Sequence, residues 1–127
     1  MRRVVVDMQN KLFADAIARA LQEESVEFQV YQSEKPTETA EICLCARARI
    51  LLMEVTSYMP WKLEERLRIR NIVKRECPDC KIVLVVDENT EKALANRVLQ
   101  AKKDGIIDNF VYGSVSAAYL SAVLDVL

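Results

Sequence analysis

Two carboxylates stand directly behind short apolar runs of this chain. Asp7 follows three consecutive valines, and Glu54 lies near the end of the run from Arg49 to Val55. Each run has the length of a buried strand, and ligand chemistry in parallel sheets gathers at the carboxyl ends of the strands. The residues beside Asp7 and Glu54 therefore decide which chemistry this edge of the sheet can support.

Four cysteines form a second group with possible chemistry, as the pairs Cys43 with Cys45 and Cys77 with Cys80. The second pair has the spacing of a zinc or redox half-site, and two such pairs could supply four thiolates. The first pair has one intervening residue in a helical pattern, where positions i and i+2 point to different faces. Ordinary reduced thiols are therefore favoured over a structural zinc site, which stays the alternative.

Several chemistries are excluded by missing residue types. The chain has no histidine, so a His general base, a His phosphocarrier and a His-containing metal site cannot form. Its glycines are Gly105 and Gly113, too few for a phosphate-cradling loop or a dinucleotide fingerprint. We expect no cofactor, no bound metal and no enzymatic active site.

Length and charge point to one small domain. The 127 residues, 51% hydrophobic and 29% charged, fit a single domain with one core covering 1–127. The 18 basic and 19 acidic residues leave a net charge of -1, which gives no field to attract nucleic acid or an anionic membrane. No signal-peptide or membrane-spanning run is present, so a cytoplasmic location is expected.

Strand and helix patterns alternate along the whole sequence. Strands are predicted at Arg3–Asp7, Glu27–Tyr31, Arg49–Val55, Lys81–Asp87 and Ile106–Tyr112. Helices are predicted at Lys11–Glu24, Pro36–Ala48, Trp61–Glu76, Thr90–Lys103 and from Ser114 to the end. Asn10 and Asn89 are placed to cap the first and fourth helices, and Gly105 is placed to end the fourth.

This alternation predicts the fold class. Parallel strands need a crossover between them, and helices usually supply it, so repeated strand–helix units imply a parallel sheet. The near-continuous apolar central strands indicate burial on both faces. We therefore expect an α/β three-layer sandwich, with five parallel strands covered by five helices.

At this level the chain resembles the receiver domain of bacterial response regulators. The resemblance covers essentially the whole sequence and rests on these segments: Val4–Asp7, Leu12-Phe13, Leu51–Val55, Met59-Pro60, and Gly105 through Asn109–Tyr112. It implies a single receiver-like domain with the flavodoxin-like strand order 2-1-3-4-5. It also implies two-component signal transduction as the general role.

The resemblance also implies a set of functional positions. A working receiver has an acidic pair after the first strand to hold Mg²⁺, an Asp on the third strand as phosphoryl acceptor, a Ser or Thr after the fourth, and a Lys after the fifth. The metal and the ammonium neutralise the phosphoryl oxygens. The corresponding positions of this chain hold Asp7 with Met8 and Gln9, then Glu54, then Val86 beside Asp87, and finally Tyr112.

These substitutions predict a degenerate receiver that is not phosphorylated. Met8 offers no hard oxygen ligand for Mg²⁺, and Val86 and Tyr112 supply neither the hydroxyl nor the ammonium. In this family a Glu at the acceptor position resembles the phosphorylated form more than an acceptor. Two alternatives stay open: Glu54 as a solvated carboxylate at a strand end, and Tyr112 as a packed aromatic.

The last helix carries more apolar surface than one face of a sheet requires. Leu120, Leu124 and Leu127 form one stripe, and Tyr119, Val123 and Val126 form another. A second stripe would be exposed unless a partner covers it, although the helix could also be more buried than usual. In receivers the fourth helix, fifth strand and fifth helix form the usual partner face. The predicted interaction face is Phe110, Tyr119, Leu120, Val123, Leu124, Val126 and Leu127.

Two functions follow from these features. The first is an atypical receiver that acts through a protein partner or a homodimer without phosphorylation. The second is a receiver that still responds to phosphate or a small ligand at the sheet edge, and that regulates a DNA-binding or other output domain outside this chain. Phosphoryl-analogue binding near Glu54 would favour the second.

Overall fold

The computed structural model describes residues 2–24 and 27–127. Its strands are β1 Arg2–Asp7, β2 Phe28–Gln32, β3 Ile50–Glu54, β4 Lys81–Val86 and β5 Asn109–Tyr112. Its helices are α1 Lys11–Glu24, α2 Pro36–Ala46, α3 Leu63–Glu76, α4 Lys92–Lys103 and α5 Ala117–Asp125. Among these helices, none has the length and apolarity needed to cross a membrane.

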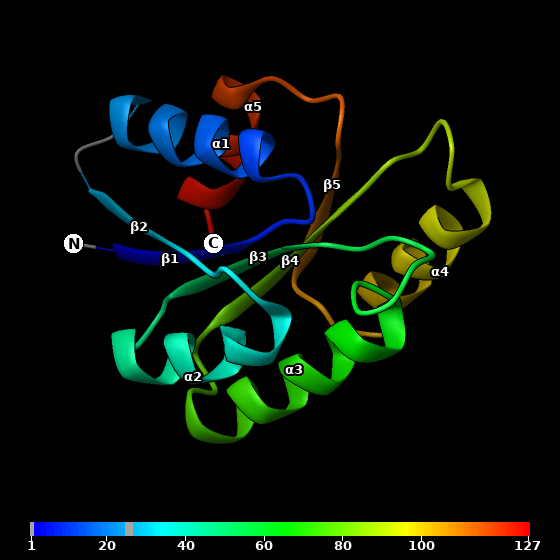
Figure 1. Cartoon of the computed structure of the whole chain (residues 1–127), viewed down its shortest axis with the longest axis horizontal. Coiled ribbons are helices and arrows are strands. Elements are labelled where there is room, and N and C mark those ends of the chain that lie inside the picture. The colour runs from blue at the N-terminus through cyan, green and yellow to red at the C-terminus, as the bar shows by residue number, and fades with distance from the viewer. Residues whose placement is uncertain (1, 25–26) are drawn as a thin grey trace.

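The strands form one parallel sheet in the order β2-β1-β3-β4-β5. Helices α1 and α5 cover one face, and α2, α3 and α4 cover the other (Figure 1). The predicted three-layer α/β sandwich and its flavodoxin-like order are therefore confirmed. The carboxyl ends of the central strands β1, β3 and β4 meet at one edge, which brings Asp7 and Glu54 to the same edge of the sheet.

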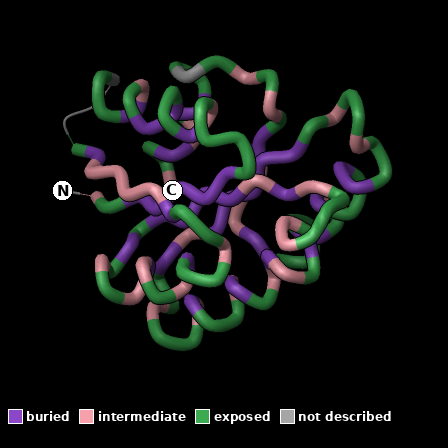
Figure 2. The backbone as a smooth tube through the Cα atoms, viewed as in Figure 1, coloured by how far each residue is buried: buried purple, intermediate pink, exposed green. Residues whose placement is uncertain are grey.

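Strand side chains alternate between two cores, one on each face of the sheet. In β1, Val4 and Val6 pack with α1 and α5, whereas Val5 packs with α2 and α3. In β3, Ile50 and Leu52 likewise face α1 and α5, and Leu51 faces α2 and α3. Figure 2 shows the buried residues concentrated in the central layer. This period of two decides which face each functional side chain of the strands reaches.

Several helix ends follow the sequence prediction. Asn10 caps α1, since its Oδ1 accepts the amide hydrogen of Phe13 at 3.1 Å. Gly105 follows α4 with φ of 75°, the left-handed conformation for which glycine is suited. Ser116 caps α5 by accepting from the amide of Tyr119 at 3.1 Å, which starts this helix later than the predicted Ser114.

Other predicted boundaries were wrong. Helix α3 begins at Leu63 because the preceding segment turns back, with the amide of Thr56 bonded to the carbonyl of Trp61. Asn89 does not cap α4, which begins after Glu91. Strand β5 begins at Asn109, since the amide of Ile106 closes the end of α4 instead of joining the sheet.

Not every apolar residue of α1 and α3 faces the sheet. Leu12 lies on α1 but is 82% exposed, and Ala16 is exposed as well. In α3, Ile72 is exposed, while Arg66 lies fully buried among Leu63, Ile69 and Val73. An arginine on the buried face of a helix requires a partner in the interior, because an unpaired buried charge is very costly.

Candidate functional site

Asp7 ends β1 with its side chain completely buried. The alternation along β1 places Asp7 on the same face as Val5, toward α2 and α3. A carboxylate taken out of water must be hydrogen-bonded or paired. The residues that face Asp7 from α2 and α3 therefore determine what this position can do.

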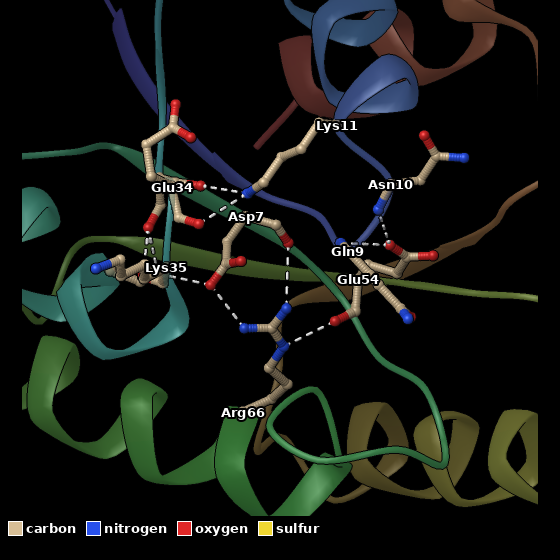
Figure 3. A network of polar contacts seen from close by, with 10 residues as sticks. Asp7, Gln9, Asn10, Lys11, Glu34, Lys35, Glu54 and Arg66 are labelled. Carbon is tan, nitrogen blue, oxygen red and sulfur yellow. Dashed lines mark hydrogen bonds and ion pairs between the residues drawn. The ribbon is translucent and has the colours of Figure 1, made fainter.

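Arg66 supplies the charge that Asp7 needs. Its Nη1 lies 2.6 Å from Oδ2 of Asp7, and its Nη2 donates to the main-chain oxygen of Asp7 at 3.3 Å. Its Nε donates to the main-chain oxygen of Glu54 at 2.7 Å. Figure 3 shows the guanidinium extending from α3 between the ends of β1 and β3. One side chain thus joins the two strands that carry the candidate carboxylates.

A pair of hydroxyls completes the surroundings of Asp7. Thr39 of α2 donates to Oδ2 of Asp7 at 2.6 Å. The hydroxyls of Thr39 and Ser33 lie 2.7 Å apart, and both residues are buried. Within the described residues, Oδ1 of Asp7 is buried without a hydrogen-bond partner. Oδ2 of Asp7 therefore accepts hydrogen bonds from both the Arg66 guanidinium and the Thr39 hydroxyl.

Glu54 turns to the other face of the sheet. It continues the alternation of Ile50 and Leu52, and its Oε1 accepts the amide hydrogen of Gln9 at 2.7 Å and that of Asn10 at 3.4 Å. Its carboxylate therefore binds the loop between β1 and α1, where the amides before a helix attract an anion (Figure 3). Asp7 and Glu54 lie at the same edge of the sheet, but their carboxylates bind different residues.

The loop between β1 and α1, which Glu54 binds, is also held by hydrogen bonds at its end next to α1. Lys11, the first residue of α1, donates from Nζ to the main-chain oxygens of Ser33 and Glu34, at 3.0 and 3.1 Å (Figure 3). The loop between β1 and α1 is thereby tied to both β3 and the segment after β2. Such multiple bonds favour one fixed arrangement of the edge.

The remaining predicted pocket residues do not gather around Glu54. Met8 and Val86 are fully buried in the two cores. Asp87 is exposed, and hydrogen bonds, first from the amide of Asn89 and then from Thr90, hold the pKa of its carboxyl below the ordinary value. Of the predicted set, Gln9 contacts Glu54 through its main-chain amide, while Asp7 lies at the same edge with its side chain on the opposite face.

Tyr112 lies at the end of β5 and is 40% exposed. Its ring meets the ring of Phe110 edge to face, with centroids 5.5 Å apart and an interplanar angle of 73°. This is the packed-aromatic arrangement that the sequence left as an alternative. The ring of Tyr112 is therefore packed on a neighbour of its own strand.

Arg66 contacts both candidate carboxylate residues but was not predicted as a site residue from the sequence. The signal was present, because positions 63, 66, 70 and 73 fall on one side of a helix, and Leu63 and Val73 are apolar members of that side. An arginine within such a stripe indicates either an edge position or a buried pair. Only the approach of α3 to β1, 59 residues apart in sequence, shows which of these applies.

The predicted interaction face divides into buried and exposed residues. Leu120 and Leu124 are buried in the core, whereas Tyr119 and Val126 are 56% and 82% exposed. Phe110, Val123 and Leu127 are half-buried. A groove of about 390 Å³ lies over β5 and α5, lined by residues that include Phe110, Tyr112, Tyr119 and Val123, with Lys102 at its side.

The four thiols are all free. Cys43 is buried and Cys45 exposed, as the spacing on one helix predicted. Within the described part of the chain, no three Cys, Asp or Glu side chains gather closely enough to hold a metal ion. The structure thus gives no support to the zinc alternative.

The chain is similar to known proteins in shape and not in sequence. No family model and no curated protein matches the sequence. Solved structures, in contrast, match over nearly the whole chain. The chemotaxis protein CheY4 of Vibrio cholerae superposes with a TM-score of 0.76 at 14% identity, covering 98% of this chain and 97% of that one. The fold is that of a response-regulator receiver domain.

Two further solved receivers show the same extent of similarity. The REC domain of AraT, a response regulator from Geobacillus stearothermophilus, gives a TM-score of 0.75 at 14% identity and covers 98% of this chain and 90% of its own. An orphan response regulator of H. pylori gives 0.72 at 13% identity, with 98% and 94% covered. At these identities the receiver fold is established by shape, while the site must be judged on its own residues.

Proposed function

We propose that this chain is a cytoplasmic, receiver-like signalling module that works without phosphorylation and acts through its α4–β5–α5 face. The observation that carries the proposal is the guanidinium of Arg66 on the carboxylate of Asp7. A receiver holds Mg²⁺ at this edge so that a cation can neutralise the incoming phosphoryl group. Here a protein side chain supplies a permanent cation in the same neighbourhood.

The charges at the edge argue against metal binding. Oδ2 of Asp7 already accepts from Arg66 and Thr39, and all three residues are buried. A divalent ion beside Asp7 would stand close to the fixed guanidinium, and like charges at short range in the interior repel strongly. Glu54 is likewise engaged with the amides of Gln9 and Asn10. We therefore expect this edge of the sheet to keep one conformation, fixed by its own side chains, in place of the switching seen in a phosphorylated receiver.

A titration with Mg²⁺ and beryllium fluoride tests this part of the proposal. The expected result is that the amide NMR signals of Gln9, Asn10 and Glu54 do not shift, because neither the metal nor the phosphoryl analogue binds. The same result is expected for Glu54→Asp, since that variant regains the usual acceptor but keeps Arg66. Saturable shifts in the unaltered chain would contradict the proposal and favour the phosphate-responsive alternative. Saturable shifts in Glu54→Asp alone would show that Glu54, and not Arg66, prevents binding.

The second part of the proposal concerns the α4–β5–α5 face. Tyr119 and Val126 expose apolar surface there, beside half-buried Phe110 and Val123. Lys102 places its ammonium 5.7 Å from the centre of the Phe110 ring. Exposed aromatic side chains within an apolar patch are typical of a protein interface. We propose that a second copy of this chain covers the face.

Sedimentation equilibrium of the whole chain tests self-association. The average mass is expected to rise with concentration toward that of a dimer, and Tyr119→Glu is expected to stay monomeric because it places a charge within the apolar face. Tyr58→Glu is the matched control, since Tyr58 is also exposed but lies in the loop after β3. An unaltered chain that stays monomeric throughout, or equal behaviour of the two variants, would contradict the dimer.

A further inference from the structure

The segment Cys77-Pro78-Asp79-Cys80 forms a tight turn between α3 and β4. The amide of Cys80 donates to the carbonyl oxygen of Cys77 at 3.0 Å, the hydrogen bond that closes a four-residue β-turn. Such a turn keeps its first and last Cα atoms within about 7 Å, and disulfides join cysteines with Cα atoms about 4.4–6.8 Å apart. The backbone therefore holds this pair close to disulfide distance.

The two thiols of the turn differ in their access to solvent. Cys77 is half-buried, whereas Cys80 is buried. Burial raises the pKa of the Cys80 thiol to about 12. Burial, with smaller contributions from Cys80 and Cys77, also raises the pKa of Cys43 well above the ordinary value. Because Cys77 is the more exposed thiol of the turn, it is the one of the two that an oxidant from solution meets first.

A groove beside the turn offers a place for that oxidant. It has a volume of about 470 Å³ and is lined by both cysteines of the turn. Its charged lining residues are Arg47, Arg49, Glu76 and Asp79, all of them exposed. Two cations and two anions around one groove suit a molecule that itself carries both ammonium and carboxylate groups. Glutathione disulfide is a small disulfide of this kind.

We propose that Cys77 and Cys80 form a reversible disulfide by exchange with a peptide disulfide of the glutathione type in this groove. The Cys77 thiolate attacks one sulfur of the bound disulfide, which joins Cys77 to one glutathione and releases the other as a thiolate. The Cys80 thiolate then attacks Sγ of Cys77 and releases the second glutathione. The two protons of the protein thiols pass to the two released thiolates, so the protein dithiol is oxidised and one disulfide is reduced to two thiols. This proposal is independent of the proposed signalling function.

The test uses the whole chain carrying Cys45→Ser, which removes the exposed thiol of α2. The protein is equilibrated in glutathione buffers of increasing oxidised fraction, quenched with acid, labelled with a maleimide and weighed intact. The expected result is the loss of two of the three remaining thiols without retained glutathione, reversed by excess reduced glutathione. Retention of all three thiols across the series would overturn the proposal.

Variants in the same background separate the two steps. Cys80→Ser is expected to accumulate one glutathione on Cys77, and Cys77→Ser is expected to keep its thiols reduced. Loss of two thiols in Cys77→Ser would show a Cys43–Cys80 bond and would also overturn the proposal. Far-UV circular dichroism in reducing buffer verifies that each variant is folded before it is compared.

The role of the groove is tested by the rate of the first step. Arg47→Ala with Arg49→Ala is expected to slow the reaction with glutathione disulfide several-fold, and to leave the reaction with neutral hydroxyethyl disulfide unchanged. Equal rates for the altered and unaltered chains with glutathione disulfide would overturn the assignment of the groove as its binding site.

Discussion

Replacing Arg66 by Met is expected to lower the free energy of unfolding by about 3–5 kcal/mol. The substitution retains an unbranched stem of similar length but leaves the buried carboxylate of Asp7 without its cation. Breaking a buried ion pair from one side is strongly destabilising, because the remaining charge is not solvated. Urea unfolding that yields an unchanged m value would measure the loss directly.

Two further variants decide whether the buried charge is the cause. Arg68 lies on the same helix, but its side chain is 68% exposed and pairs with the neighbouring Glu65, so a change within about 0.5 kcal/mol is expected for Arg68→Met. Combining Asp7→Asn with Arg66→Met removes both charges and is expected to recover a large part of the lost stability. An Arg66→Met variant as stable as the unaltered chain would mean that Asp7 is not held as described.

Replacing Leu124 by Ala is expected to lower the free energy of unfolding by about 2–5 kcal/mol. Leu124 lies fully buried between α5 and the sheet, so the shortened side chain leaves a cavity in the core. The control is Val126→Ala, just after the same helix, where the side chain is 82% exposed and a change within about 0.5 kcal/mol is expected. Thermal and urea unfolding of the two variants give the comparison.

The contrast between Leu124 and Val126 also separates folding from recognition. The stripe containing Leu120 and Leu124 belongs to the core, whereas Tyr119 and Val126 belong to the surface. A variant of the first stripe that failed to dimerise would be uninformative, because its fold would be weakened. Equal losses of stability from Leu124→Ala and Val126→Ala would mean that α5 packs with a different face toward the sheet.

We propose that the sheet edge of this chain differs from a phosphoryl-accepting edge in how its charge is balanced. A receiver leaves its carboxylates open to Mg²⁺ and to the phosphoryl donor, so the charge balance can change. In this chain the balance is built from Asp7, Arg66 and Thr39 inside the protein. We therefore expect the edge to act as a fixed part of the structure, and the exposed faces to carry the signal.

The sequence alone was sufficient for the order of elements and the fold class. Apolar runs such as Leu51–Met53 and the alternation of strands with helices are local properties, and each is repeated along the chain. The cap at Asn10 and the left-handed Gly105 are local for the same reason, because each depends on a few neighbouring residues. The sequence also identified Asp7 and Glu54 as the carboxylates of the sheet edge.

Only the tertiary structure decided what these carboxylates contact. The pleat sends Asp7 toward α3 and Glu54 toward the loop before α1, so their partners lie 59 and 45 residues away in the chain. Periodicity places a side chain on a face of its own helix or strand, but it does not specify which distant side chain that face meets. The sequence therefore showed Arg66 only as a charged residue within an apolar stripe of a helix. The packing of α3 on the sheet buries Arg66 together with Asp7, and the two side chains pair because a buried charge needs a partner of opposite charge.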